Sequence, residues 1–296
     1  MSGPTPQQIE PAGGLGTLLK AALPSIPVVN ALPGIRKTAG KEFAGLAFSR
    51  PPVTIERADV EAYAAVCGFP NKDVVPLPYP HMLAFGLQMA IMSDPGFPAP
   101  AIGTVHLENT ITQHRAIAVG ETLAVTASVG SAVPHPKGTV YEFVTEVRAE
   151  GDVVWEETSA YLRRVSTGST TGGQPYGMVL PEAPANGTTW KLPADLGRRY
   201  AAVSGDHNPI HLYPLTAKAL GFPRQIAHGM WTLARCTAAL ENRLPDAVRV
   251  DVAFKKPVTL PGTVAFGSTP INQGYAFSLT NPRSGAPHLA GRTTAL

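Results

Sequence analysis

The chain has 296 residues, which is enough for two domains of ordinary size. Hydrophobic residues make up 44% and charged residues 15%, a composition that supports a large core and excludes a disordered chain. A net charge of +3 is too small for a nucleic-acid-binding surface and compatible with an anionic small ligand. No apolar run has the length of a membrane span and the first residues lack a basic signal region, so we expect a cytoplasmic protein.

The first half of the chain reads as helices followed by long strands. Residues 1–45 are rich in Pro, Gly and Ala, and we interpret them as an N-terminal extension with one short apolar helix at 15–23 that packs on the body. A membrane-surface helix there is the less favoured alternative, because its polar face carries little beyond Lys20. Helical spacing predicts helices over 56–66 and 81–92. Four β-branched, turn-bounded segments then predict strands, at 106–118, 121–133, 139–149 and 153–165.

The second half repeats this order after a linker. Residues 166–187 contain a Ser-, Thr- and Gly-rich run typical of flexible linkers. A strand at 188–192 follows, then helices at 195–203, 214–220 and 228–244. The predicted strands after the long helix are 249–258, 263–268, 273–279 and 289–295. Cys67 and Cys236 lie on apolar helical patterns, which indicates buried, reduced thiols.

An internal repeat relates the two halves. Tyr63-Ala-Ala-Val-Cys-Gly matches Tyr200-Ala-Ala-Val-Ser-Gly at an offset of 137 (200 minus 63). Phe69 stands in the first copy where Asp206 stands in the second. Pro80-His81-Met82 opens an apolar helix, as His228-Gly229-Met230 does later. A repeat of this length is consistent with a duplicated domain rather than a solenoid.

The stretch after Tyr200 carries the chemistry. Asp206 and His211 flank turn-forming residues, and we expect both on one tight loop where they converge. A carboxylate that orients an imidazole can polarise a water molecule and move its protons. The first N–H groups of the helix that begins near residue 228 suit a developing oxyanion, and Gly229 leaves that backbone unblocked. The structural alternative is a turn with a helix cap and a core histidine.

Residues 200–217 resemble the motif of the MaoC-like, R-specific enoyl-CoA hydratases, which have the hotdog fold. The matched residues are Tyr200, Ser204, Gly205, Asp206, Asn208, Pro209, Ile210, His211 and Ala217, and Ala227-His228-Gly229 resembles the start of that family's central helix. The resemblance implies that Asp206 and His211 activate water, that Asn208 helps to hold it, and that the Gly229 N–H binds the thioester carbonyl.

With this resemblance the expected fold is α+β, a double hotdog in which two antiparallel sheets, each wrapped around a central helix, join side by side. The N-terminal hotdog, 46–165, lacks the catalytic dyad, and the C-terminal hotdog, 188–296, carries the motif. We therefore expect one active site per chain, in a pseudo-dimeric monomer or a homodimer. The helix at 81–92 in the first half is expected to border the acyl tunnel, although its apolar residues also suit plain core.

Several residues are candidates for substrate binding. Ser204, Asn208 and His228 belong to the matched segments, and Arg224, Lys255 and Lys256 could meet the phosphates of coenzyme A. Solvated surface charge explains the last three equally well. The histidines on strand or turn patterns, His106, His114 and His135, have no further ligand at metal-site spacing, so we expect no metal.

The expected reaction is reversible hydration of a trans-2-enoyl thioester to the (3R)-3-hydroxyacyl thioester, without a cofactor beyond the thioester carrier. The carrier is coenzyme A or acyl carrier protein. Two alternatives stay open: a hotdog acyl-thioesterase, and a non-catalytic subunit that binds acyl thioesters. No nucleic acid partner is expected.

Overall fold

The structure is a computed structural model that describes residues 5–10, 43–99, 103–164, 176–185 and 187–296. The helix predicted at 15–23 and the Ser/Thr/Gly run of the linker lie outside these residues. Among the helices of the described ranges, none is both long and apolar enough to cross a membrane.

Two helices and the first strands confirm the pattern of the N-terminal half. Helix α2 (Arg57–Cys67) ends at Gly68, whose φ of 81° is the left-handed conformation that terminates many helices. Helix α3 (Pro80–Ser93) is buried on most sides, as suits a helix at the centre of a wrapped sheet. A 3-10 turn, η3 (Phe43–Gly45), precedes them. The strands are β1 (Gln7–Gln8), β2 (Ala47–Ser49), β3 (Val53–Thr54), β4 (Thr104–Gln113), β5 (Thr122–His135), β6 (Gly138–Ala149) and β7 (Asp152–Arg164).

The C-terminal half has the predicted order with three corrections. Its elements are β8 (Thr188–Leu192), α4 (Leu196–Ser204), α5 (Pro209–Leu212), α6 (Pro214–Ala219), α7 (Gly229–Leu240), η4 (Glu241–Arg243), β9 (Val248–Phe254), β10 (Gly262–Ile271), β11 (Gly274–Thr280) and β12 (Pro287–Ala295). His211 lies on the one-turn helix α5 and not on a loop. Helix α7 stops at Leu240, where the chain tightens into η4. Strand β9 ends at Phe254, so Lys255 and Lys256 follow the strand instead of lying on it.

All strands in the described part of the chain join one twelve-stranded sheet, which confirms the double-hotdog prediction. The order along the sheet is β1-β2-β5-β6-β7-β4-β9-β12-β11-β10-β8, and β3 pairs with β5. The pairing is antiparallel except between β1 and β2. The two halves meet at the β4–β9 seam, where Glu108 pairs with Ala253 and Gln113 with Val248. Each half thus covers an edge strand of the other.

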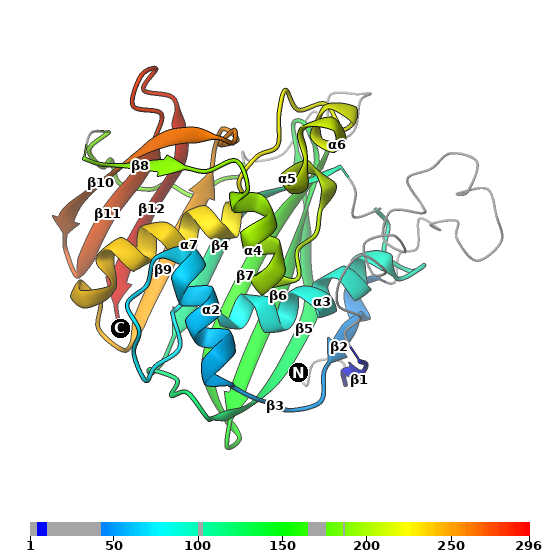
Figure 1. The fold of residues 1–296 in the computed structure, drawn as a ribbon. Coiled ribbons are helices and arrows are strands. Elements are labelled where there is room, and N and C mark those ends of the chain that lie inside the picture. The colour runs from blue at the N-terminus through cyan, green and yellow to red at the C-terminus, as the bar shows by residue number, and fades with distance from the viewer. Residues whose placement is uncertain (1–4, 11–42, 100–102, 165–175, 186) are drawn as a thin grey trace.

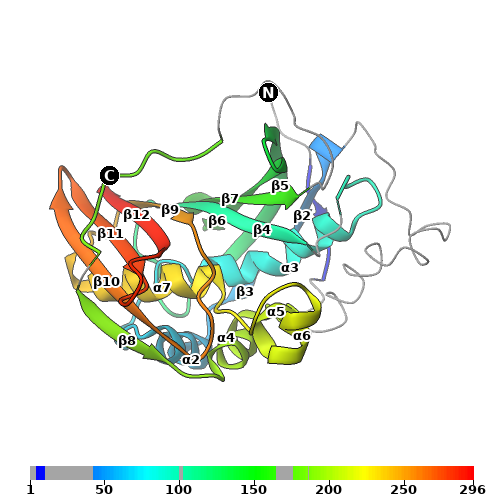
Figure 2. The same cartoon turned by 90° about the horizontal axis from the view of Figure 1, so that it is seen from above.

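The central helices lie along one face of this sheet. In Figure 1 α3 and α7 lie in front of the strands, and in Figure 2 they lie beneath them, with α2 and α4 packed together on the outer side. The repeated tyrosines Tyr63 and Tyr200 meet there, with ring centroids 6.2 Å apart. The Trp231 indole N–H donates to the Val66 carbonyl over 3.0 Å and ties α7 to α2. This packing places the loop after α4 beside the N-terminus of α7. Cys67 and Cys236 are free and buried, as predicted.

Candidate active site

The loop that carries Asp206 is fixed by its own side chains. Gly205 ends α4 with a φ of 74°. The Asp206 N–H then donates to Ser204 Oγ over 3.2 Å, and Asp206 Oδ1 accepts the Asn208 N–H over 3.0 Å. Asn208 Oδ1 in turn accepts the Ile210 N–H over 3.4 Å and caps α5. The turn therefore holds the Asp206 carboxylate in place and leaves Oδ2 available.

His211 is oriented by a backbone carbonyl and not by Asp206, contrary to the expectation from sequence. Its buried imidazole donates from Nδ1 to the Ile226 carbonyl over 2.8 Å. With the proton on Nδ1, the other nitrogen, Nε2, carries the lone pair that can accept a proton. The Ile226 carbonyl thus selects the tautomer that general-base chemistry requires.

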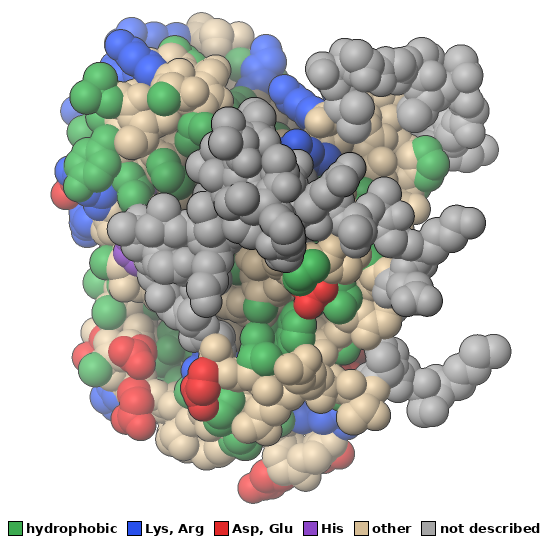
Figure 3. Space-filling view, turned by 90° about the vertical axis from the view of Figure 1, so that its right-hand side faces the viewer, with side chains coloured by type: hydrophobic (Ala, Val, Ile, Leu, Met, Phe, Trp, Pro, Cys, Tyr) green, Lys and Arg blue, Asp and Glu red, His purple; other side chains and the backbone are tan. Residues whose placement is uncertain are grey.

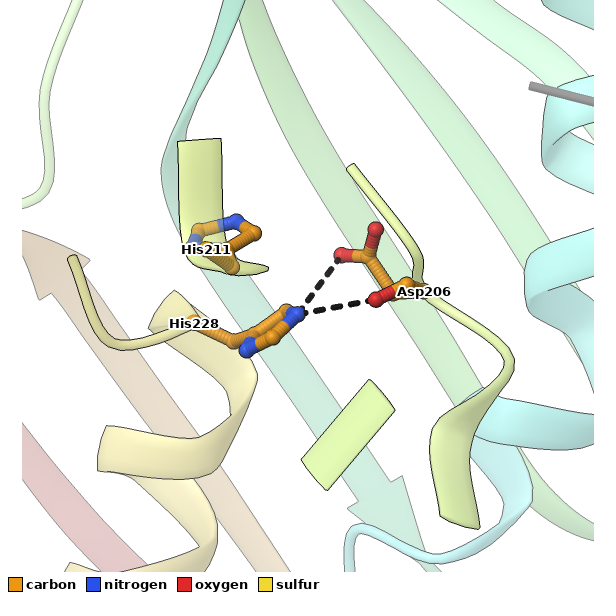
Figure 4. A group of neighbouring side chains, drawn as sticks. All are labelled: Asp206, His211 and His228. Carbon is orange, nitrogen blue, oxygen red and sulfur yellow. Dashed lines mark hydrogen bonds and ion pairs between the residues drawn. The ribbon is translucent and has the colours of Figure 1, made fainter. Parts of the chain in front are cut away.

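His228 joins the two groups. Its Nε2–H donates to the Asp206 backbone carbonyl over 3.0 Å and lies 3.8 Å from Asp206 Oδ2 (Figure 4). Its ring stacks on His211 with centroids 3.7 Å apart and lies 4.9 Å from the Tyr200 ring. The side chains of Asp206, His211 and His228 each offer a polar atom within 4.8 Å of the others. The structure therefore brings the acid and the imidazole together.

Burial keeps both imidazoles neutral. Burial lowers the pKa of His211, against the opposing effect of the Asp206 carboxylate. Burial and, to a lesser extent, the neighbouring His211 ring lower the pKa of His228 to about 3, although Asp206 opposes both. Near pH 7 the site consequently holds two neutral imidazoles beside one carboxylate, and His211 Nε2 is free to accept a proton.

Gly229 opens α7 next to this pair. It is the first helical residue, so its N–H has no acceptor within the helix, and no residue that the structure describes accepts from it. A Cβ at this position would lie 3.3 Å from the Phe254 ring, so only glycine fits there without displacing that ring. The first half differs, because the N–H groups of His81 and Met82 at the start of α3 already donate to Pro78 and Tyr79. The oxyanion-type N–H is thus a property of the second half.

Comparison with known proteins agrees with this geometry. A family model described as "MaoC like domain" matches residues 178–271, which contain Asp206, His211 and Gly229. The chain is 37% identical to 3-hydroxyacyl-thioester dehydratase X of Mycobacterium tuberculosis over 286 residues, 96% of this chain and 98% of that protein.

The chain belongs to the MaoC-like dehydratase family. Its members named among the relatives are dehydratases and hydratases, and the chain is a hydro-lyase. The crystal structure of M. tuberculosis HtdX superposes with a TM-score of 0.75 at 37% identity, covering 84% of this chain and all of that one. Peroxisomal multifunctional enzyme type 2 of Drosophila melanogaster shares the fold, with a TM-score of 0.66 at 19% identity over 84% of this chain and 48% of that one.

The remaining candidates of this MaoC-like dehydratase lie at different distances from the dyad. Ser204 and Asn208 build the Asp206 turn, and His228 contacts Asp206 directly. The side chains proposed to meet phosphates are exposed and make no described contact with the dyad: Arg224, Lys255 and Lys256. Figure 3 shows Lys and Arg gathered toward the upper part of one face, and Asp and Glu toward its lower part. The role of Arg224, Lys255 and Lys256 in binding phosphates stays a prediction.

Asp206, His211 and His228 also form the one group with metal-ligand separations found among the described residues. His211 Nδ1 and His228 Nε2 each donate a proton to a backbone carbonyl. Both rings therefore already have one nitrogen committed within the protein. The expectation that the reaction needs no metal stays a prediction.

Sequence reasoning missed two features of the site. One is the Ile226 carbonyl, because a backbone acceptor leaves no trace in side-chain types. The other is the buried pair of His81 and Glu157 in the first half, joined by bonds of 2.8 and 2.9 Å to the two carboxylate oxygens. Glu157 lies in an acidic dipeptide, a pattern typical of solvent-exposed residues. Its alternation with Trp155 and Ser159 on the helix-facing side of β7 was the available signal.

Proposed function

We propose that this MaoC-like dehydratase catalyses the reversible hydration of trans-2-enoyl thioesters to (3R)-3-hydroxyacyl thioesters. The observation that carries the proposal is the convergence of the Asp206 carboxylate and the His211 ring beside the N-terminus of α7. The names of two relatives, 3-hydroxyacyl-thioester dehydratase X and 3-hydroxybutyryl-CoA dehydratase, support the substrate class.

The addition step divides between the two sides of the site. The thioester carbonyl accepts the Gly229 N–H, which draws electron density from the double bond and makes the β-carbon electrophilic. A water molecule between Asp206 Oδ2 and His211 Nε2 attacks that carbon and gives up one proton to this pair. The electron pair of the double bond moves onto the enolate, which the Gly229 N–H stabilises. The pair then returns the proton to the α-carbon on the same face.

The neutral state of His211 suits this sequence. Its Nε2 lone pair accepts a proton, and the adjacent carboxylate stabilises the imidazolium that forms. Asn208 is proposed to steady the water with its side-chain NH₂ group, since its Oδ1 is engaged by Ile210. His228 is a positioning residue, because it binds the Asp206 peptide and stacks on His211.

The carrier is proposed to be coenzyme A or acyl carrier protein. Arg224, Lys255 and Lys256 are exposed cations of the second half and are proposed to meet carrier phosphates. Each contact of this kind with a solvated phosphate contributes little binding energy and lies away from the reacting atoms. We therefore expect single substitutions to raise KM slightly and leave kcat unchanged.

The test is an assay of trans-2-enoyl-CoA substrates with chiral analysis of the product. We expect loss of the enoyl absorbance, formation of the (3R)-3-hydroxyacyl-CoA, and no release of free thiol. Release of coenzyme A detected with a thiol reagent would instead identify a thioesterase. Binding of acyl-CoA without either product would identify a non-catalytic subunit, and both outcomes would contradict the proposal.

A further inference from the structure

The first hotdog contains a buried polar network that the proposed reaction does not use. Glu157 on β7 lies at its centre and is 2% exposed. Its carboxylate accepts hydrogen bonds from His81 Nδ1 at 2.8 Å, Asn109 Nδ2 at 2.7 Å and Gln88 Nε2 at 3.3 Å. Three side-chain donors therefore already satisfy this carboxylate, and a further ligand would have to bind elsewhere in the network.

Two acceptors of the network are buried and have no described partner: His106 Nε2 and Asn109 Oδ1. The His106 ring is neutral, because burial lowers its pKa well below the usual range and His81 lowers it further. The ring also forms a hydrogen bond with the backbone of Glu108 that raises its pKa, so the ring is the donor in this bond. Because Nε2 has no described partner, the donating nitrogen is Nδ1. Nε2 is then a lone-pair acceptor. Unpaired buried acceptors are costly, and both of these require a donor group.

The network adjoins the thioester site through a row of aromatic rings. The His106 ring stacks on Tyr161 at 4.3 Å and lies 4.8 Å from the Phe254 ring. Phe254 is the ring against which Gly229 packs. Burial raises the pKa of Tyr161 well above its usual range, and the carboxylates of Glu157 and Asp206 both raise it further, so this tyrosine lies in the field of both acids. His106, from the first hotdog, and Gly229, from the second, thus contact the same Phe254 ring.

We propose that His106 and Asn109 form a subsite that binds a hydroxyl group on the acyl chain, so that the enzyme prefers enoyl thioesters that carry a hydroxyl beyond the reacting double bond. This inference rests on the proposed function, which places the thioester carbonyl at Gly229. An acyl chain that left Gly229 along Phe254 would reach the His106 ring next, since both residues contact the Phe254 ring. A hydroxyl is the neutral donor that an acyl chain can offer, and its single proton can go to one of the two acceptors, His106 Nε2 or Asn109 Oδ1.

The substrate comparison uses trans-2-octenoyl-CoA and its derivatives with one hydroxyl placed on the fifth, sixth, seventh or eighth carbon. We expect one of these derivatives to have a kcat/KM about tenfold above that of the plain substrate, the size of one net hydrogen bond to a buried acceptor. His106→Phe keeps the ring stacking and removes the acceptor, so it should abolish the preference and leave the plain substrate within about twofold. His106→Gln restores an acceptor and should retain part of the preference.

His114→Phe is the matched control, because His114 is an exposed histidine just beyond β4 whose Nε2 pairs with Glu156 at 2.8 Å. It should leave the preference unchanged. Calorimetric binding of octanoyl-CoA and its hydroxylated derivatives, which cannot react, tests the subsite without turnover. If no enoyl-CoA is hydrated but the hydroxylated ligand binds more tightly, the proposed function fails and the subsite stands.

Equal kcat/KM for plain and hydroxylated substrates in the wild-type enzyme would overturn the subsite, whatever the variants do. A preference that survives in folded His106→Phe protein would overturn it as well. Both results would mean that the two acceptors bind ordered water only. A cooperative thermal unfolding transition shows that each variant is folded. If His106→Phe does not fold, the comparison of plain and hydroxylated substrates in the wild-type enzyme alone tests the subsite.

Discussion

His228 links the parts of the site through a single imidazole. Its Nε2–H holds the Asp206 peptide, its face supports the His211 ring, and its backbone leads directly into Gly229. Residues that act on others in this way usually change activity when the geometry of their partners loosens, without contacting the reacting atoms. The buried neutral state of His228 also has a measurable consequence for stability.

The folded protein should lose stability in acid because His228 cannot take up a proton. Burial lowers the pKa of His228 to about 3, whereas a free imidazole titrates near 6.5. Between these values the unfolded chain binds a proton that the folded chain does not. The contribution of neutral His228 is complete above about pH 6.5 and falls by about 1.4 kcal/mol per pH unit below it. Urea unfolding at pH 7 and pH 5 should therefore show a loss of roughly 2 kcal/mol that His228→Phe does not share. Parallel losses in both proteins would contradict this.

Gly229→Ala should reduce turnover at little cost in stability. The new Cβ would lie 3.3 Å from Phe254, so the ring must move by a few tenths of an ångström, and the methyl group would crowd a carbonyl that approaches the N–H. We expect kcat/KM to fall by at least about tenfold, since the lost interaction strengthens in the transition state. Gly45→Ala is the control, because a Cβ there meets nothing within 4 Å. Unchanged kcat/KM for Gly229→Ala would contradict the claim that the thioester carbonyl needs an unobstructed approach to this N–H.

At the scale of elements, α5 decides where His211 lies. Turn-forming residues predict a loop at this point, and they do form the Asp206 turn. The sequence Asn208-Pro209 is also a helix start, with a capping side chain followed by proline at the first helical position. A helix of four residues gives no hydrophobic period to detect, so the sequence pattern could predict the turn but not the helix.

Substitutions of Asn208 separate its two proposed roles. Asn208→Ala removes the cap, and we expect a loss of about 1 kcal/mol in unfolding free energy together with lower kcat. Asn208→Ser keeps an oxygen that can cap α5 but lacks the NH₂ group. It should restore the stability and leave kcat low, if that group steadies the water. Denaturant unfolding and steady-state kinetics of both variants are the measurements. Wild-type kcat in Asn208→Ser would assign Asn208 to capping alone.

For the molecule as a whole, the β4–β9 seam makes the two hotdogs one body. Asp251 on β9 is buried at this seam, where it binds Arg249 and Arg292 and accepts the Thr110 hydroxyl from β4 over 2.9 Å. Burial alone would raise the pKa of Asp251, but these hydrogen bonds hold it below its ordinary value. The Asp251 side chain therefore keeps its negative charge at the seam.

Asp251→Asn should destabilise the whole chain, because the buried Asp251 carboxylate loses the charge that binds Arg249 and Arg292. We expect a loss of about 1 to 2 kcal/mol in unfolding free energy, because the charge-assisted hydrogen bonds of Asp251 weaken while both arginine side chains can still be solvated. Urea unfolding gives the value, and Glu146→Gln, which breaks an exposed pair with Arg148, should change stability by less than about 1 kcal/mol. Equal effects of the two substitutions would show that the seam does not depend on Asp251.

The duplicated pattern predicts the double hotdog, because helices, strands and turn residues follow one another in the same order in both halves. The match of Tyr63 with Tyr200 even identifies two residues that meet in space. The joining of β4 to β9 depends on which edges meet, which no local pattern encodes. The alternation along β7 indicates that Glu157 faces the helix, but its pairing with His81 could not be predicted, because the two residues are far apart in the chain.

The central claim is that one carboxylate and one imidazole activate water at a single site, and Asp206→Asn tests it most directly. The amide can still accept the Asn208 N–H through Oδ1, so the turn and the fold should persist. We expect the rate of hydration of trans-2-octenoyl-CoA to fall by at least about a hundredfold, the usual effect of losing a general base, with an unchanged melting temperature. A folded Asp206→Asn protein that hydrates this substrate at the wild-type rate would contradict the account.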